Sequence, residues 1–463
     1  MTELSSRKKG PVASELLDTR LPMTIHRQFQ GHDVYVSIGS PRPDRALLYA
    51  PTLQRLVDVS AAAADRATGL QKGHFEEALR EYIPRAHEEL QSACKSAVAV
   101  GVVDHEQRKQ LVVFPLSVGL SRRCTLACSY CHVDARSVGE VTSRAVLEAA
   151  VRHAEEQVRK HAMKSLHVSF SVGGEPTYEW ETFLWFVEMC NHAARKLGVT
   201  AYKAITTNGF YDEKVRSFLC KEFDHILLSI DGPQAIQDAH RPTAAGKSSF
   251  AVVVDSGRTF AREAKRFAVR ATVSDFSAPS LNEVVEFFVA SFGKATEIVL
   301  EPMVEIGRAS ARAGSDPAPP GQLQFARAFW SAYRTGMTLG VKVASSCFNA
   351  TRIVRTFCKS VSMPSFVVTS SGNVTICARD AGGKDYGYAR YEPESGRFRV
   401  DEVRLGQLAA MTQLPGKCSD CICLWHCAGD CPDTRLVGID RCEANRLLLS
   451  WHLRYLVGGK EGT

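Results

Sequence analysis

The amino-acid sequence predicts an α/β protein built around a partial barrel of six parallel strands, with a small domain before it and a cysteine-rich domain after it. The first observation is that apolar runs of strand length alternate with helical patterns between residues 109 and 306, which is typical of βαβ units. The second is that the 463 residues, 45% hydrophobic and 23% charged, have the composition of a globular protein with room for about three domains. The third is that nine of the 15 cysteines lie between residues 347 and 442.

We expect five segments along the chain. They are a flexible N-terminus (1–22), a small winged-helix-like α+β domain (23–108), the partial barrel (109–306), a linker with a bridging helix (307–345) and the cysteine-rich domain (346–463). In the winged-helix-like domain, short strands are predicted and then helices, which favours a small α+β module. The predicted strands are 24–29, 33–38 and 46–49, and the predicted helices are 60–67 and 73–98.

The barrel region contains six runs of strand length, separated by five helical patterns. The runs are 111–116, 166–172, 202–206, 225–230, 267–273 and 297–301, and the helical patterns are 143–161, 181–197, 212–223, 248–265 and 281–292. Residues 307–321 are rich in Gly, Ala and Pro, which indicates a linker, and a further helix is predicted at 322–337. In such sheets the chemistry lies beyond the carboxyl ends of the strands.

The overall charge and the cysteine content suggest where the protein works. The net charge of +7 is a mild excess that does not require a nucleic-acid partner. No apolar run of about 18 residues and no signal peptide is recognised, so we expect a cytoplasmic protein without a membrane segment. In a reducing compartment, 15 thiols are more consistent with metal ligands than with a disulfide framework.

Three cysteines directly follow the first barrel strand. Cys124, Cys128 and Cys131 lie within eight residues on one loop, so their thiolates can bind one metal centre and leave a coordination position open for chemistry. A [4Fe–4S] cluster fits this description. A structural zinc site is the alternative, and it requires a fourth ligand, for which His132 is the nearest candidate.

This loop, with Tyr130 before its last cysteine, resembles the signature of the radical S-adenosylmethionine (SAM) superfamily. The run Gly173-Gly174-Glu175-Pro176, after the second strand, resembles the GGEP motif of the same family. The resemblance implies that the three cysteines hold a [4Fe–4S] cluster and that the GGEP motif holds the amino group of SAM. Because the two motifs follow two successive strands, chance is a poor explanation.

Further matches follow the third and fourth strands. Asn208 belongs to a TNG turn, and Ser229 begins a run, residues 229–241, similar to one found in the peptide-modifying branch of the family. The resemblance implies that Ser229 and Arg241 bind the SAM carboxylate or ribose, with help from Asn208. Ordinary turn chemistry is the alternative for Asp231. The order of residues around His240 departs from the family pattern, and no role is assigned to it.

The C-terminal cysteines are similar to the seven-cysteine pattern of the SPASM domain. That domain carries two auxiliary [4Fe–4S] clusters, so the resemblance implies three clusters in all. The implied ligands of auxiliary cluster I are Cys358, Cys377 and Cys431, with Cys347 as a possible fourth, and those of auxiliary cluster II are Cys418, Cys421, Cys427 and Cys442. Cys423 fits no ligand position. A pair of zinc ribbons is the alternative.

The resemblance implies a radical SAM oxidoreductase. Such enzymes reductively cleave SAM to a 5′-deoxyadenosyl radical, which abstracts hydrogen from a substrate, and they receive electrons from a donor such as flavodoxin or ferredoxin. Residues 45–64 resemble the precursor-recognition element of enzymes that mature ribosomally made peptides, in which a leader peptide adds as a strand to a sheet edge. We therefore expect a precursor peptide as substrate and a thioether, C–C or C–O crosslink as product. A cap without a peptide role is the alternative for this domain.

Other reactions remain open at this point. Formylglycine formation, as in sulfatase maturases, uses an Asp beside the second cysteine of the array. Here the acid is displaced to Asp380, three residues after Cys377, which weakens that reading but leaves Asp380 a candidate general base. Epimerisation of a peptide, radical oxidation of a small molecule and a metal-binding module without radical chemistry are the further alternatives.

Overall fold

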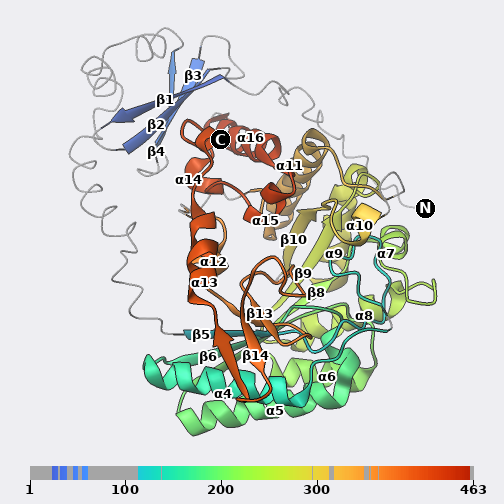
Figure 1. Cartoon of the computed structure of the whole chain (residues 1–463). Helices are drawn as coiled ribbons and strands as arrows, with labels where there is room; N and C mark the ends of the chain where they lie inside the picture. Colours follow the sequence, from blue (N-terminus) through green and yellow to red (C-terminus); the bar gives the residue numbers. More distant parts are fainter. Residues whose placement is uncertain are drawn as a thin grey trace, which may run out of the picture.

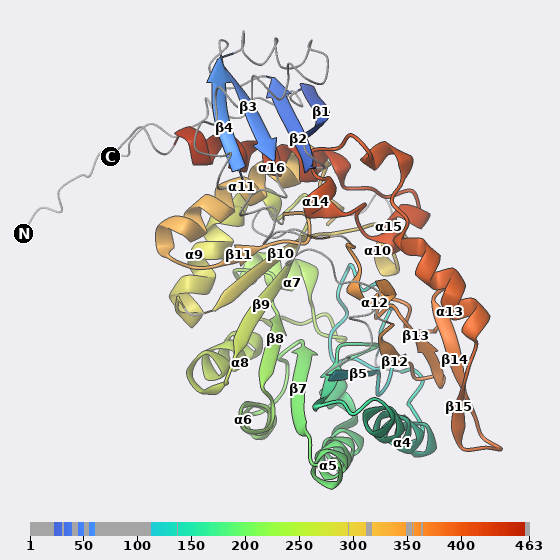
Figure 2. The ribbon, with the colours of Figure 1, turned by 90° about the vertical axis from the view of Figure 1, so that its left-hand side faces the viewer.

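The computed structural model describes residues 23–29, 32–38, 45–50, 55–60, 113–136, 138–294, 296–311, 317–348, 354, 356–362 and 364–458. Its largest element is an 11-stranded sheet in the order β11-β10-β9-β8-β7-β6-β5-β12-β13-β14-β15. Six successive strands pair in parallel and form the predicted partial barrel (Figures 1 and 2). They are β5 (Val113–Val118), β6 (Ser165–Phe170), β7 (Thr200–Thr207), β8 (His225–Ser229), β9 (Phe267–Val273) and β10 (Glu297–Pro302).

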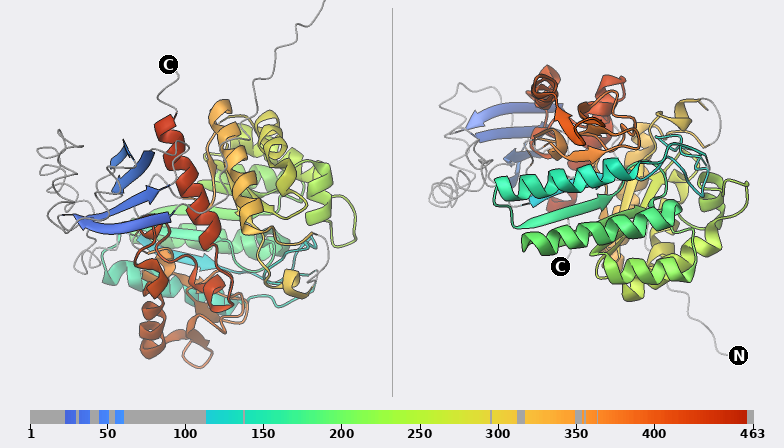
Figure 3. Two further views of the ribbon diagram at one scale, coloured as in Figure 1. Left: turned by 90° about the horizontal axis from the view of Figure 1, so that it is seen from above. Right: turned by 60° about the horizontal axis from the view of Figure 1, so that its bottom comes forward.

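Helices cover the outer face of the barrel (Figures 2 and 3). They are α4 (Arg144–Lys160), α5 (Trp180–Leu197), α6 (Glu213–Glu222), α8 (Phe250–Glu263), α9 (Leu281–Phe292) and α11 (Gln322–Leu339). Local signals set their ends: the side chains of Ser143 and Asp212 accept hydrogen bonds from the first turns of α4 and α6, and left-handed Gly198 and Gly340 end α5 and α11. In the ranges that the structure describes, no helix is long and apolar enough to cross a lipid bilayer.

The two faces of the barrel strands differ in chemistry. In β9, Phe267, Val269 and Ala271 are buried in the core under the helices, whereas Arg270 between them is exposed. Strand residues alternate between faces, so Arg270 points toward the inside of the barrel. The same inner face carries Ser229, which pairs with Arg270 across β8 and β9. The barrel interior is therefore polar at this level.

Short elements follow the strands and shape the rim of the barrel. They are η4 (Pro176–Glu179), α7 (Gln234–His240), η5 (Ala278–Ser280), α10 (Arg308–Ala311) and β11 (Val343–Ala344). The segment 307–321 was predicted to be only a linker. Its first residues instead form α10, because they pack onto the cysteine loop as described below.

The cysteine-rich domain continues the barrel sheet, which the sequence did not predict. β12 (Phe366–Val368) pairs in parallel with β5, and β13 (Asn373–Thr375), β14 (Gly387–Glu392) and β15 (Arg397–Val400) follow in antiparallel order. The remaining helical elements of the domain are α12 (Lys359–Ser362), α13 (Glu402–Ala409), η6 (Ala410–Thr412), η7 (Gly416–Cys418), α14 (Leu424–Cys427), α15 (Pro432–Leu436) and α16 (Cys442–Gly458). Trp451 of α16 lies 6.4 Å from Trp330 of α11, measured between ring centroids.

The N-terminal strands form a separate antiparallel sheet beside α16 and α14 (Figure 2). Its strands are β1 (Met23–Phe29), β2 (His32–Ile38), β3 (Arg45–Ala50) and β4 (Arg55–Ser60). Three of them match the predicted strands, but Ser60, expected to begin a helix, instead ends β4. The predicted helices otherwise lie outside the described residues. Tyr49 packs against Ile422 and Leu449 and shares a hydrogen bond with His426 at 2.5 Å.

Candidate functional site

The three predicted cluster ligands lie on the loop that leaves β5. Cys124 donates its backbone N–H to the carbonyl of Arg136 at 2.7 Å, and the carbonyl of Cys128 accepts from the N–H of Cys131 at 3.3 Å. These bonds fold the loop back on itself. The sequence had indicated the cysteines, and the structure places them on the loop that follows β5, with Cys128 and Cys131 joined by one turn.

Arg308 of α10 holds this loop from outside, and sequence reasoning missed it. Its guanidinium donates to the carbonyls of Cys128 and Ala135 at 2.7 and 2.6 Å and to the carboxylate of Asp134 at 2.8 Å. Gly307 precedes it with a φ of 59°, and a Cβ there would lie 2.5 Å from the carbonyl oxygen of His132. A glycine followed by an arginine was the available signal, but it was read as linker composition.

Gly173 and Gly174 bring the second motif against the cysteine loop. The N–H groups of Gly174 and Glu175 donate to the carbonyls of Ser121 and Arg123, both at 2.8 Å. A Cβ on Gly174 would lie 1.9 Å from the carbonyl oxygen of Arg123, and one on Gly173 would lie 2.5 Å from that of Ser121. The glycines are therefore required because two backbones touch, which is a stronger constraint than a simple turn.

Glu175 joins the second and third strand ends. Its buried carboxylate accepts from the hydroxyls of Thr177 and Thr207 and from the N–H of Asn208, each at 2.8 Å. Burial raises the pKa of Glu175, and these hydrogen bonds oppose that rise. In this arrangement the carboxylate orients the neighbouring loops, and the backbone of residues 173–175 faces the cysteine loop.

Asn208 also points to the cysteine loop. Its amide nitrogen lies 3.0 Å from the hydroxyl oxygen of Thr125 and 3.5 Å from the sulphur of Cys124, and its oxygen accepts from the N–H of Phe210 at 2.8 Å. The side chain therefore has a fixed orientation. An N–H donor directed at a cysteine sulphur is an interaction that supports a thiolate ligand.

Arg241 and Tyr130 lie together beside Cys128. The guanidinium of Arg241 lies 3.5 Å from the Cys128 sulphur and 5.5 Å from the ring centroid of Tyr130. Its Nε is buried without a hydrogen bond, although the carboxylate of Asp231 lies 3.4 Å away. Ser229, the last residue of β8, is also buried. A buried guanidinium with an unused donor suits a site that receives an anionic group.

The donor set around the first cysteines fits an iron–sulphur cluster. Burial first, and then the neighbouring Cys128 and Glu175, raise the pKa of Cys124 to about 12. A thiol in such surroundings needs a bound cation to stay ionised. Over the described residues, no three Cys, His, Asp or Glu side chains meet in metal-binding geometry. The fit of these residues to a cluster therefore depends on the loop that carries the three cysteines and on Asn208 and Arg241, which direct N–H groups at two of the sulphurs. The buried Nε of Arg241, which has no hydrogen bond, adds a donor for an anionic ligand.

The C-terminal cysteines fall into two groups. Burial, and then the nearby thiol of Cys431, raise the pKa of Cys358, and Cys431 also acts on Cys377. The second group contains neighbours of the Cys427 thiol, whose pKa is raised by burial and then by Asp430 and by other cysteines. Its members are Cys418, Cys421, Cys427 and Cys442. Cys423, which fits no implied ligand position, has Cys421 and Cys427 as neighbours and so lies in the second group as well.

Cys347 lies with the second group. It is 2% exposed and lines a cavity of about 10 Å³, the space of a single water, together with Cys423, Cys427 and His426. Burial raises its pKa to about 12, and the main opposing influence is Arg441. In this structure Cys347 is therefore a neighbour of Cys427 and of the unassigned Cys423.

Asp380 is fully engaged with the backbone of its own loop. Its carboxylate accepts from the N–H groups of Lys384, Asp385 and Tyr386 at 3.0, 3.1 and 2.8 Å. Three amide donors hold the carboxylate in place and fix the turn that follows Cys377. This favours a structural role for Asp380 over the predicted role as a general base.

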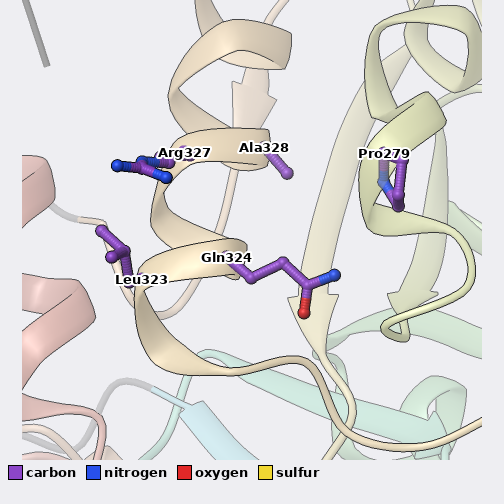
Figure 4. Close-up of a pocket in the computed structure, with 5 residues that line it drawn as sticks. All are labelled: Pro279, Leu323, Gln324, Arg327 and Ala328. Atoms are coloured by element: carbon purple, nitrogen blue, oxygen red, sulfur yellow. The ribbon is translucent and has the colours of Figure 1, made fainter.

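A larger pocket lies away from the cysteines, between α11 and η5 (Figure 4). It has a volume of about 460 Å³ and is lined by Pro279, Leu323, Gln324, Arg327 and Ala328. Figure 4 shows Gln324 and Ala328 on the side of α11 that faces Pro279. The lining contains neither a thiol nor a carboxylate, so this pocket has no evident place in the chemistry above.

Comparisons with known proteins agree with this geometry. Residues 118–273 match the model of the radical SAM superfamily. The cysteine-type anaerobic sulfatase-maturating enzyme of Clostridium perfringens strain ATCC 13124 is 27% identical over 207 residues, 42% of this chain and 53% of that protein, and the strain 13 enzyme is 26% identical over the same shares. The chain thus spans about half the length of the curated relatives it matches.

Solved structures share the fold. Native anSMEcpe with bound AdoMet superposes with a TM-score of 0.58 at 18% identity, covering 75% of this chain and 100% of that one. The same protein with bound AdoMet and the Kp18Cys peptide gives 0.60 at 18% identity, with 76% and 99% covered. At this identity the similarity concerns the fold.

Proposed function

We propose, from the premise that residues 118–273 form a radical SAM domain, that this chain cleaves SAM reductively and abstracts hydrogen from a residue of a peptide substrate. The observation that carries the proposal is the meeting of three motifs at one end of the barrel. The cysteine loop, the glycine pair of residues 173–174 and Asn208 contact one another through the hydrogen bonds described above. Each motif follows a different strand, β5, β6 or β7.

The chain's own residues supply positioning. Cys124, Cys128 and Cys131 would hold a [4Fe–4S] cluster, which supplies the electron for SAM cleavage when it is bound. The remaining proposed SAM contacts come from the three strand ends and the loop. They are Tyr130, Gly173, Gly174, Glu175, Asn208, Ser229 and Arg241. Among these, Glu175 acts by orienting the loops, since its carboxylate is engaged by Thr177, Thr207 and Asn208.

Two auxiliary [4Fe–4S] clusters complete the proposed cofactor set. Cluster II would use the four cysteines of the second group. Cluster I would use Cys358, Cys377 and Cys431, and it would keep an open position because Cys347 lies beside Cys427 instead. Such clusters accept the electron that is left when a substrate radical is oxidised. Thiolate-bound clusters also suit the reducing cytoplasm, with flavodoxin or ferredoxin as the electron donor.

A precursor peptide is the substrate that the N-terminal sheet favours. The sheet has two edges, β1 and β4, and an edge strand can receive an extended leader peptide through main-chain hydrogen bonds. The relatives' names point to peptides as well, since two anSMEcpe structures contain the Kp18Cys and Cp18Cys peptides.

A crosslink is the proposed product. The carboxylate of Asp380 is occupied by three amides, which disfavours formylglycine formation with Asp380 as base.

The inside of the barrel adds information about the substrate. Arg270 is exposed on the inner face of β9, and no ion pair joins its guanidinium to any carboxylate of the described residues. Its charge also lowers the pKa of His132, after the larger effects of burial and of Arg379. An unpaired cation at this place favours a substrate that carries a carboxylate near the reacting residue.

The test is anaerobic co-expression with a candidate precursor peptide encoded near this gene, followed by mass spectrometry. Loss of a hydrogen pair from the peptide would support a crosslink, and fragmentation would locate it. Unchanged mass with deuterium uptake from heavy water would identify epimerisation instead. A Cys124→Ala variant, which lacks one cluster ligand, is the control. If the peptide is unmodified while 5′-deoxyadenosine still forms, the peptide proposal is wrong.

A further inference from the structure

A buried carboxylate that the proposed function does not use lies behind the cysteine loop. Asp231 is 1% exposed and follows β8. Its Oδ2 accepts from the hydroxyl of Tyr130 at 2.6 Å and lies 3.1 Å from Nδ1 of His240. The Nε of Arg241 is 3.4 Å from the same oxygen, and Oδ1 accepts from the N–H of Thr272 at 2.9 Å. One side chain therefore contacts the cysteine loop, the C-terminal end of α7 and strand β9.

A second layer of buried groups fixes this carboxylate. His240 uses its other nitrogen on the hydroxyl of Ser274, at 2.8 Å. Gln237 accepts from the N–H of Asp231 and donates to the hydroxyl of Ser249, both at 3.0 Å, and that hydroxyl donates to the carbonyl of Arg241 at 2.7 Å. All these side chains are buried. A closed network of this kind holds its members in one arrangement.

The network contains one balanced pair of charges. Burial alone would raise the pKa of Asp231, but Arg241 and the hydrogen bonds from His240 and Tyr130 outweigh it, and the pKa is lowered. The carboxylate is therefore ionised beside a guanidinium that is always charged. The same guanidinium lies 3.5 Å from the Cys128 sulphur. The positive electrostatic potential at the proposed cluster thus depends on how far the carboxylate of Asp231 neutralises the guanidinium of Arg241.

We propose that Asp231 is a positioning residue that holds Arg241 and Tyr130 against the cysteine loop and keeps the reduction potential of the SAM-binding cluster low. Charge near a cluster and hydrogen bonds to its sulphurs are among the factors that set such potentials. The reduced cluster carries one more negative charge than the oxidised one, so an unbalanced Arg241 stabilises the reduced form. Loss of the Asp231 charge must then shift the potential upward and weaken the cluster as a reductant of SAM.

Asp231→Asn separates this effect from folding. The amide oxygen can still accept from the N–H of Thr272, while the amide nitrogen can donate to the oxygen of Tyr130 and, after a change of tautomer, to His240. The negative charge beside Arg241 is therefore lost, and the Tyr130 hydroxyl changes from hydrogen-bond donor to acceptor at this position. Asp224→Asn is the matched control, because Asp224 precedes β8 at the opposite end of the strand. Its carboxylate accepts from the backbone N–H of Lys203 at 2.8 Å and from the ammonium of Lys265 at 2.9 Å.

The experiment uses the full chain with its clusters reconstituted and needs no peptide. Iron and sulphide per chain are measured first. A redox titration then follows the electron paramagnetic resonance signal that changes on adding SAM, and the rate of 5′-deoxyadenosine formation with dithionite is measured. For Asp231→Asn we expect wild-type iron content, a higher potential and a rate lower by about tenfold. Asp224→Asn should match the wild type in all three.

A wild-type potential and rate in a cluster-loaded Asp231→Asn protein would overturn the inference, because a merely structural role would change only stability. If this variant fails to take up iron, Arg241→Gln provides the second test. It leaves Asp231 unbalanced, so the potential must shift downward, and an unchanged potential would again refute the charge argument. The inference rests on the proposed radical SAM site but not on its peptide substrate, so an unmodified peptide leaves it intact.

Discussion

Gly174→Ala gives the sharpest test of how the site is assembled. The new Cβ would lie 1.9 Å from the carbonyl oxygen of Arg123 and 2.6 Å from its carbonyl carbon, so the two backbones must move apart. Overpacking of this kind costs about 1–3 kcal/mol. The separation also lengthens the hydrogen bonds from Gly174 to Ser121 and from Glu175 to Arg123, which contribute about 1 kcal/mol each. The total cost is about 3–5 kcal/mol.

This cost falls on the conformation that binds the cluster and SAM. Since about 1.4 kcal/mol corresponds to a tenfold change in affinity, SAM binding to the reconstituted chain should weaken about a hundredfold or more. Equilibrium filtration with labelled SAM, together with iron content, measures this. Gly406→Ala is the control, because Gly406 lies in α13 with no atom within 4 Å of a Cβ, and alanine there should stabilise the helix by about 0.5–1 kcal/mol. Wild-type SAM affinity in Gly174→Ala would refute the contact argument.

Three further substitutions test other parts of the site. Arg308→Ala removes three hydrogen bonds from the cysteine loop, so iron content should fall, whereas Arg399→Ala, at an exposed ion pair, should leave it unchanged. Asp380→Asn should keep peptide modification within about twofold, because the amide oxygen can still accept from the loop; a loss of activity with unchanged melting temperature would restore Asp380 as a base. Cys347→Ala should retain the iron content of the wild type, while Cys358→Ala should lose about one cluster, and equal losses would make Cys347 a ligand.

The barrel could be predicted because its signals are local. Each barrel strand is a short apolar run. In each helix the apolar residues recur with the period of about 3.6 residues that is typical of helices. The motifs follow the strand ends directly. The glycine pair was recognised from its pattern, although the physical reason, contact with the carbonyl of Arg123, became visible only in the structure. The strand β4 was missed because residues 56–64 contain both an alternating stretch and a run of alanines, and the alanines favoured a helix.

The remaining features depend on contacts between distant parts of the chain. Arg308 binds main-chain carbonyls, which carry no sequence signal, so its segment resembled a linker. Asp231 was interpreted as a turn residue and His240 was assigned no role, because their partners, Tyr130 and Ser274, lie 101 and 34 residues from them. Cys347 was only a possible fourth ligand of auxiliary cluster I in the sequence, and in space it lines a small cavity together with Cys423 and Cys427.

The pairing of β12 with β5 has a consequence for how the protein is made. Phe366 lies opposite Leu116, so the second edge of β5 stays uncovered until roughly 250 further residues have left the ribosome. At about 5–20 residues per second, this takes about 10–50 s. During that time β5 offers unpaired hydrogen-bonding groups to other chains, which invites aggregation. A nascent chain cut short before residue 366 would keep that exposed edge permanently, so successful production of this protein should depend on synthesis of the complete chain and on chaperones that shield the edge until then.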